Sequence, residues 1–380
     1  MSSTRSNVCI VGAGITGLAI AYELASRGVN VVILERAGIG AGASGVQPGG
    51  VRQQWGTRVN CVLARESLEF YRRVEEHLDA PHVGPLTECG YVFLAHSDER
   101  LAGLSREVAL QQEMGVPSVL LDPAELSELV PGLDVSTVTG AAYCAEDGYF
   151  DRPQAVVEAY AAAAQRHGVR IELREVVALR RTAGGWTLDG ANGEGHEAET
   201  VILAAAYDTP ALVAPLNVTL PIAREPRYLF YSEPIRERLL EPLVISSERA
   251  FAAKHLASGR VLASHLAANG DPSGSSDDWR RAIKRNVREL LPLLEYVEYS
   301  VLVEGFYDVT PDNQPVLGPV PGHDGLWLAA GFSGHGFMLA PAVSRALANL
   351  LVDRTSNPLF EDFALERFER AQLTPELQVV

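Results

Sequence analysis

The stretch that decides the fold is Val8–Gly17 (VCIVGAGITG), which is followed by a helical pattern and an acid at Glu35. Its first four residues are apolar and predict a strand, and the three glycines then predict a tight turn. Apolar residues recur at helical spacing over Leu18–Ala25, and Val31–Leu34 predicts a second strand that ends at Glu35. The order strand, glycine turn, helix, strand is that of a βαβ unit.

The glycine spacing of this unit predicts a dinucleotide site. In the pattern Gly12-x-Gly14-x-x-Gly17, the first glycine permits the turn, the second lets the backbone approach a pyrophosphate, and the third allows close packing of helix and strand. The helix N-terminus stabilises the phosphate charge, and Glu35 can accept hydrogen bonds from ribose hydroxyls. A purely structural tight turn is the alternative. The residues expected at this site are Gly12, Ala13, Gly14, Ile15, Thr16, Gly17, Glu35 and Arg36.

The same geometry serves both NAD and FAD, and two further segments favour FAD. Gly40–Gly45 is rich in Gly, Ala and Ser directly after Glu35, and a second glycine turn lies at Gly331–Gly336. Because an extended flavin needs contacts from several distant segments, these turns favour FAD over NAD.

Composition sets the broad class of the protein. The 380 residues are 47% hydrophobic and 21% charged, which is typical of a globular chain of two or three domains. The net charge of −16 disfavours nucleic acid and anionic membrane surfaces as partners. Four scattered cysteines predict neither a metal site nor a disulfide framework, and they suit a reducing compartment. We therefore expect a cytoplasmic enzyme with no membrane span, no targeting segment and no metal.

The rest of the chain predicts a second α/β segment and a strand-rich insertion. A helix is expected over residues 153–166, with Asp151 as its N-cap, and a buried strand over Thr200–Ala206. Strands around a polar helix at 277–290 follow. A strand at Leu326–Ala330 then leads into the second glycine turn and a helix over 341–351, whereas residues 38–56 are expected to form a loop. The predicted fold class is α/β with an α+β second domain.

Several blocks of sequence resemble one known family, the FAD-dependent D-amino acid oxidase and sarcosine oxidase family, over essentially the whole chain. Among its members the chain is most similar to the β-subunits of heteromeric sarcosine oxidase and L-proline dehydrogenase. The blocks that carry the resemblance are Gly12–Gly17 with Glu35-Arg36, Gly42–Gly45, Gly49–Arg52, Asp308–Gly318 and Gly331–Met338.

The resemblance implies a fold and an activity. It implies a Rossmann-like, glutathione-reductase-type FAD domain formed by residues 1–87, 145–218 and 306–380, and a sheet-based substrate domain formed by 88–144 and 219–305. It also implies hydride transfer to flavin N5 from a small amine or amino acid of the sarcosine, proline, glycine or D-amino acid type, followed by hydrolysis of the imine. A partner subunit or an electron acceptor is implied as well.

The resemblance also suggests site residues, each of which has a purely structural alternative. Arg52 is expected near the flavin or the substrate carboxylate, His335 beside the flavin ring, and His265, Tyr307 and Met338 at the pocket. The further cofactor-binding residues expected are Ala43, Ser44, Gly49, Gly50, Val176, Gly331, Phe332, Ser333, Gly334, His335, Gly336 and Phe337.

Departures from the family pattern qualify this expectation. Gly305 stands where covalent members have a cysteine, so FAD is expected to bind non-covalently. Met338 replaces a lysine that holds the substrate carboxylate, which leaves Arg52 as the expected partner of that group. The chain has only two lysines, and Lys254 is the one candidate for promoting reaction with oxygen, which favours a dehydrogenase. A non-catalytic flavin-holding subunit and a nicotinamide-dependent dehydrogenase remain alternatives.

Overall fold

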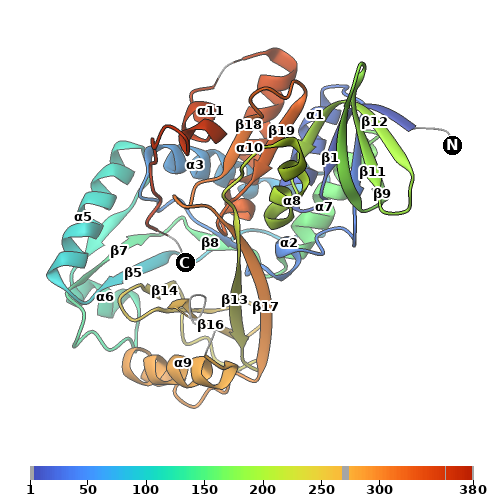
Figure 1. Cartoon of the computed structure of the whole chain (residues 1–380). Helices are drawn as coiled ribbons and strands as arrows, with labels where there is room; N and C mark the ends of the chain where they lie inside the picture. Colours follow the sequence, from blue (N-terminus) through green and yellow to red (C-terminus); the bar gives the residue numbers. More distant parts are fainter. Residues whose placement is uncertain (1–3, 268–273, 356, 379–380) are drawn as a thin grey trace.

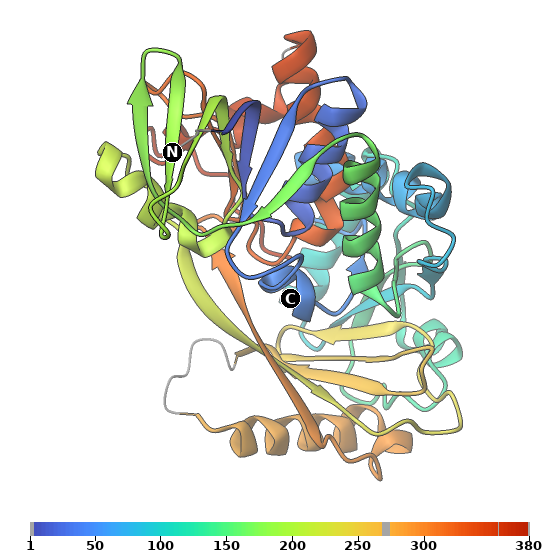
Figure 2. The ribbon, with the colours of Figure 1, turned by 90° about the vertical axis from the view of Figure 1, so that its right-hand side faces the viewer.

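The computed structural model describes residues 4–267, 274–355 and 357–378, and its strands form two large sheets (Figures 1 and 2). The first sheet has the order β10-β11-β12-β1-β2-β9, and β19 joins it by pairing with β12 and with β18. Strands β1, β2, β9, β12 and β19 pair in parallel, whereas β10, β11 and β18 pair antiparallel to their neighbours. The bounds are β1 Thr4–Val11, β2 Val31–Glu35, β9 Arg170–Leu173, β10 Val176–Thr182, β11 Gly185–Gly190, β12 Gly195–Leu203, β18 Val316–Pro319 and β19 Leu326–Ala330.

Side-chain alternation along β1 explains how both faces of this sheet are buried. Val8 and Ile10 pack into a core with helices α1, α3, α7 and α10, whereas Cys9 and Val11 point into a second core on the opposite face. The second core includes α8 and the β10–β11 hairpin. The helix bounds are α1 Ile15–Ser26, α3 Arg58–Arg72, α4 Val74–His77, α7 Pro153–Arg166, α8 Thr209–Val213 and α10 Gly336–Ala348.

The second sheet has the order β17-β13-β16-β15-β14-β5-β7-β6. One face packs on α9 and α6, and the other face packs on α5. Its long antiparallel pair β13–β17 runs from the first sheet to the level of α9 (Figures 1 and 2). The bounds are β5 Tyr91–Ala95, β6 Val119–Leu121, β7 Gly140–Cys144, β13 Ala223–Tyr231, β14 Leu243–Ser246, β15 Phe251–His255, β16 Val261–His265, β17 Val301–Val309, α5 Asp98–Glu113, α6 Pro123–Leu129 and α9 Ser276–Leu290.

Short elements complete the chain. A small sheet has the order β3-β8-β4, and among the described residues no helix is long and apolar enough to cross a membrane. The short elements are β3 Gly50–Val51, β4 Thr87–Glu88, β8 Gly148–Tyr149, α2 Ala43–Val46, α11 Leu359–Asp362, the 3-10 helices Ala206–Asp208, Ala214–Leu216, Pro292–Leu294 and Leu365–Arg367, and a π-helix at Asn349–Asp353.

The βαβ unit, the strand at Leu326–Ala330 and the helix at 153–166 are confirmed, and three local predictions are wrong. Residues 38–56 are not all loop, because they contain α2 and β3. Asp151 is not the N-cap of α7; Arg152 occupies that position, and Asp151 accepts a hydrogen bond from the Ser258 backbone instead. Helix α10 begins at Gly336 rather than 341, with Pro341 inside it.

Candidate active site

The glycine turn after β1 has no room for side chains at two of its glycines. A Cβ on Gly12, where φ is +109°, would lie 2.4 Å from the Ala204 carbonyl oxygen. A Cβ on Gly17 would lie 2.1 Å from the Gly12 carbonyl oxygen. Gly14 differs, because its φ of −75° is ordinary and its Cβ would meet only the Ser44 hydroxyl, at 3.2 Å. Gly12 and Gly17 therefore let strand and helix approach, and Gly14 keeps the helix N-terminus open.

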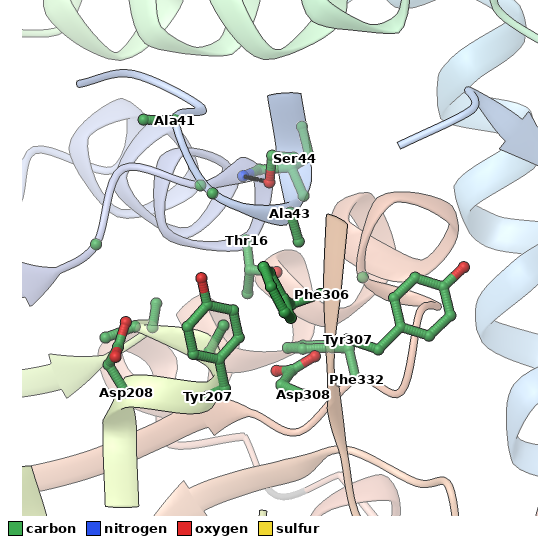
Figure 3. Close-up of a pocket in the computed structure, with 18 of the residues that line it drawn as sticks. Thr16, Ala41, Ala43, Ser44, Tyr207, Asp208, Phe306, Tyr307, Asp308 and Phe332 are labelled. Carbon is green, nitrogen blue, oxygen red and sulfur yellow. Dashed lines mark hydrogen bonds between the residues drawn. The ribbon is translucent and has the colours of Figure 1, made fainter. Parts of the chain in front are cut away.

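Two side chains hold the backbone around this helix N-terminus. Glu35 Oε2 accepts a hydrogen bond from the Ala13 N–H at 2.8 Å, and its Oε1 accepts one from the Ala37 N–H, also at 2.8 Å. Ser44 Oγ accepts a hydrogen bond of 2.9 Å from the Ile15 N–H (Figure 3). The site thus combines the positive end of α1 with a fixed carboxylate, a combination that suits a pyrophosphate and a ribose.

A cavity of about 540 Å³ begins at this helix N-terminus and extends to the β13–β17 pair. Figure 3 shows Thr16, Ala43 and Ser44 on one side of it, with Phe306, Asp308 and Phe332 facing them. The sequence-predicted residues that line it are Gly12, Gly14, Ile15, Thr16, Glu35, Arg36, Ala43, Ser44, Gly50, Val176, Tyr307, Phe332, Gly334, Gly336, Phe337 and Met338. Segments far apart in the sequence therefore meet at one cavity, as an extended dinucleotide requires.

The second glycine turn is held by Asp308, a residue of the quoted sequence blocks to which the sequence assigned no role. Its Oδ2 accepts a hydrogen bond of 2.6 Å from the Gly331 N–H, and its carbonyl oxygen accepts one from the Ser333 N–H. Burial raises the pKa of Asp308 to about 6, although hydrogen bonds from the turn oppose this shift. Asp308 lies on β17 and lines the cavity, so it joins the turn to the second sheet.

Five of the residues that line the cavity, which we call the chamber residues, are Gly50, Arg227, Tyr307, Gly334 and Met338. A Cβ on Gly334 would lie 2.3 Å from the Tyr307 ring, and a Cβ on Gly50 would lie 3.2 Å from Met338 Cε. The guanidinium of Arg227 lies 4.4 Å from the centre of the Tyr307 ring. The sequence did not single out Arg227; the register of β13 opposite β17, which pairs it with Gly305, brings it here.

Arg52 lies outside the set of described residues that line the cavity, contrary to expectation. It is 1% exposed, donates hydrogen bonds to the carbonyl oxygens of Gln54 and Gln378, and stacks on the Trp55 ring at 3.7 Å. Burial lowers its pKa. The contact with Gln378 explains the difference, because the sequence does not reveal that the C-terminal segment returns to this loop.

The two predicted histidines likewise have no side chain among the described cavity-lining groups. His335 is buried with its ring edge-on to Trp55 at 4.3 Å, and neither ring nitrogen has a hydrogen-bond partner in the described structure. Burial, with the nearby charge of Arg52, lowers the pKa of His335 well below its usual value. His265 ends β16, and its Nδ1 lies 3.1 Å from the carbonyl oxygen of Ala250, which directly precedes β15. Of the other predicted cofactor-binding residues, Ala13, Gly17, Gly49, Gly331 and Ser333 are likewise not among the residues that line the cavity.

Lys254 is buried beside the cavity loop. Its Nζ donates a hydrogen bond of 2.5 Å to the carbonyl oxygen of Pro48, which lines the cavity, and it lies 4.5 Å from the Tyr149 ring. Burial lowers the pKa of Lys254 to about 7. Within the described chain, Lys254 reaches the cavity only through this loop contact and is absent from its lining.

The fold and the cavity define an oxidoreductase-type dinucleotide site: a βαβ unit, an acid at the end of β2, and a chamber against a second sheet. The family model described as FAD dependent oxidoreductase matches residues 7–350. The chain belongs to this family, and FAD is its cofactor. The glycine cradle, the open N-terminus of α1 and the cavity fit that group.

Three individual proteins are similar to this chain over nearly their full length. The chain is 29% identical to glycine oxidase of Geobacillus kaustophilus, over 96% of this chain and 97% of the relative. It is 26% identical to sarcosine oxidase subunit beta of Rhodobacter capsulatus, over 98% and 91%. The crystal structure of L-proline dehydrogenase from P. horikoshii superposes with a TM-score of 0.90 at 27% identity, over 98% of this chain and 100% of that one. These matches confirm the predicted family and fold class.

Proposed function

We propose that this enzyme oxidises a small amino acid or amine of the glycine, sarcosine or proline type and releases an imine that water hydrolyses. The observation that carries the proposal is the continuity of one cavity from Glu35, at the dinucleotide end, to the chamber at Tyr307 and Met338. The names of the three similar proteins above, glycine oxidase, sarcosine oxidase subunit beta and L-proline dehydrogenase, support an amino acid or amine as substrate.

We assign FAD binding to the predicted residues of the two glycine turns and the segments between them. The N–H groups at the start of α1 would hold the pyrophosphate, and Glu35 would accept hydrogen bonds from the ribose. Ala43, Ser44 and Val176 would flank the cofactor, and the Gly331–Phe337 turn would contact its ring system. When bound, FAD supplies the hydride acceptor. Binding is non-covalent in this proposal, since no cysteine of the described chain lines the cavity.

The chamber residues would position the substrate. Tyr307 and Met338 line the cavity with an aromatic ring and a thioether. In this proposal their apolar surfaces keep water away from the reacting carbon of the substrate. Arg52 and His335 would act from behind the second turn as positioning residues rather than through contact with substrate. His335 packs against the Trp55 ring, and its two ring nitrogens have no hydrogen-bond partner in the described structure.

We also propose the domain division predicted from the sequence, with FAD bound by residues 1–87, 145–218 and 306–380 and the substrate covered by 88–144 and 219–305. The boundaries at 87/88 and 305/306 fall within β4 and β17. A strand that belongs to both domains would fix the chamber relative to the cofactor.

A partner subunit and a cytoplasmic location complete the proposal. The relative named sarcosine oxidase subunit beta supports assembly with a second chain, and four free cysteines are consistent with a reducing compartment. Affinity purification from the source cell tests assembly, since a stoichiometric second chain is expected. Recovery of a single chain with full activity would argue against it.

A turnover assay tests the function. The purified yellow protein is mixed with glycine, sarcosine, L-proline or D-alanine, and reduction of a dye is compared with formation of hydrogen peroxide in air. We expect one of these amines to drive dye reduction, with less peroxide formed. Absence of turnover with every amine and every acceptor, in protein fully loaded with FAD, would overturn the proposal.

A further inference from the structure

Residues 374–378 pack against the loop that carries Arg52 and Trp55, and they bring a buried carboxylate, Glu376, to that loop. Four donors at 2.9–3.1 Å surround the carboxylate, and they are the N–H groups of Gly56 and Gln378, the Thr57 hydroxyl and the Asn60 side-chain amide. The first two donate to Oε1 and the last two to Oε2. A protonated carboxyl group must itself donate from one oxygen, whereas N–H donors face both oxygens here, which indicates that Glu376 is ionised.

Glu376 is joined to Arg52 through Gln378. The Gln378 N–H donates a hydrogen bond of 2.9 Å to Glu376 Oε1, and the Gln378 carbonyl oxygen accepts one from the Arg52 guanidinium. The two charged side chains are 0% and 1% exposed, so solvent screens their attraction little. Burial lowers the pKa of Arg52, and the charge of Glu376 is the largest effect that opposes this shift. Glu376 is therefore the main partner of the buried Arg52 charge.

Asp147 is a second buried acid near Arg52, and it compensates less of that charge. Its oxygens accept hydrogen bonds from the Gln53 N–H at 2.7 Å and from Gln54 Nε2 at 2.9 Å, which hold the loop rather than the guanidinium. Burial raises the pKa of Asp147 to about 7, although these hydrogen bonds oppose the shift. A large part of Asp147 is therefore neutral at pH 7.

The charge of Arg52 reaches the second glycine turn through two rings. The Arg52 guanidinium lies 3.7 Å from the centre of the Trp55 ring, and the His335 ring lies edge-on to Trp55 at 4.3 Å. Burial and, after it, the charge of Arg52 lower the pKa of His335. The neighbours of His335, Gly334 and Gly336, line the cavity. The electric field of Arg52 therefore acts on the part of the cavity that this turn lines.

We propose that Glu376 is a positioning residue that holds Arg52 and neutralises its charge, and that this buried pair sets the reduction potential of the bound flavin. The inference rests on the proposed function, in which the second glycine turn contacts the flavin ring. A reduced flavin carries more negative charge than an oxidised one. An uncompensated cation behind the turn therefore favours reduction, and an uncompensated anion opposes it.

The experiment measures the midpoint potential of the bound flavin by chemical reduction in the presence of a reference dye, so it needs no substrate. The charge variants are Glu376→Gln, Arg52→Gln and the double variant with both changes. Glu376→Asp keeps the charge. Thr57→Val is the matched control, because it removes a hydrogen bond to Glu376 but no charge. Flavin content and thermal unfolding are measured for each protein, so that a variant that fails to fold is recognised.

We expect Glu376→Gln to raise the midpoint potential and Arg52→Gln to lower it. The double variant should return towards the wild-type value, because the pair is neutral again. Glu376→Asp and Thr57→Val should keep the wild-type potential even where they lower the unfolding temperature. If Glu376→Gln fails to fold, the double variant compared with Arg52→Gln gives the same test, and its potential should be the higher one.

Two results would overturn the inference: equal potentials in wild type and all folded charge variants, or a shift in Thr57→Val as large as that in Glu376→Gln. Potentials that follow the charges in a protein that no amino acid reduces would overturn the proposed function alone.

Discussion

The carboxylate of Asp308, on β17, accepts a hydrogen bond of 2.6 Å from the backbone N–H of Gly331, the first residue of the second glycine turn. Gly331 has φ of +76°, and a Cβ there would lie 2.6 Å from Thr310 Cγ2. A side chain at Gly331 would therefore be strained and crowded, and the Asp308 contact ties the turn to the second sheet. Because the adjoining residues line the cavity, this contact links the substrate side of the molecule to the cofactor side.

Asp308→Asn tests the cost of that buried carboxyl group. Burial raises the pKa of Asp308 from 3.8 to about 6, so the folded chain holds this proton more tightly than the unfolded chain. The stabilisation is present below pH 3.8 and is lost as the pH rises through 6. The free energy of unfolding of the wild type, relative to Asp308→Asn, should fall between pH 4 and 6 by at most about 1.4 kcal/mol per pH unit. Denaturant unfolding measures the unfolding free energy of both proteins at each pH. If the difference between wild type and Asp308→Asn did not change with pH, burial would not raise the pKa of Asp308 as stated.

The first glycine turn separates loss of cofactor from loss of fold. Gly14→Val should fold, since the backbone of Gly14 is ordinary, but the added side chain points to the cavity and should weaken FAD binding by about 100-fold or more. Gly17→Val should not fold, because its Cβ would overlap the Gly12 carbonyl oxygen. Gly195→Ala, whose Cβ would meet only Thr187 Cγ2 at 3.5 Å, is the control. Circular dichroism reports folding, and the ratio of flavin to protein absorbance reports FAD binding. A Gly14→Val protein that folds and keeps its yellow flavin would contradict the role of Gly14 in FAD binding.

Asp312 and Arg367 form a buried pair that holds the C-terminal region. Two guanidinium nitrogens donate to the carboxylate at 2.8 and 3.0 Å, and the two residues are 0% and 3% exposed. Arg367→Ala leaves the Asp312 carboxylate buried without its partner, and should cost about 3–5 kcal/mol. Arg281→Ala removes the exposed pair with Asp278 and should cost far less stability, because solvent screens that pair. Urea unfolding measures both variants. An equal loss of unfolding free energy in Arg367→Ala and Arg281→Ala would contradict the account, which rests on the difference in burial between the two ion pairs.

Lys254 should make stability rise with pH. Its pKa falls from 10.5 to about 7 on folding, so the unfolded chain binds this proton more tightly. The contribution is present above pH 10.5 and is lost as the pH falls through 7. Wild type should therefore gain stability relative to Lys254→Met between pH 7 and 10. Lys284→Met, which removes the partly exposed pair with Glu298, serves as control. If the curves of unfolding free energy against pH were parallel for Lys254→Met and Lys284→Met, burial would not lower the pKa of Lys254 as stated.

The local sequence was sufficient for the βαβ unit formed by β1, α1 and β2. Gly12, Gly17 and Glu35 lie close together along the chain, and the uninterrupted apolar run Val8–Val11 is typical of a strand that is buried on both faces. The family resemblance correctly placed the second glycine turn near the first. These features depend on contacts within one βαβ unit or on motifs with a fixed spacing.

The chamber could not be derived in the same way, because it depends on long-range register. Arg227 meets Tyr307 only because β13 pairs with β17, nearly 80 residues away in the sequence. Arg52 is held away from the cavity lining by a hydrogen bond to the carbonyl oxygen of Gln378, which lies far from it in the sequence. Neither contact has a local signal, and an arginine in a strand or a loop looks the same whether or not it faces a ligand.

Anaerobic reduction of the bound flavin is the most direct measurement of the central claim, that one cavity brings FAD and an amino acid together. The yellow protein is mixed with sarcosine, L-proline, glycine or D-alanine in the absence of oxygen, and the absorbance near 450 nm is followed. We expect full bleaching within one turnover by at least one of these amino acids. A flavin that dithionite bleaches but that none of these amino acids reduces would contradict the account.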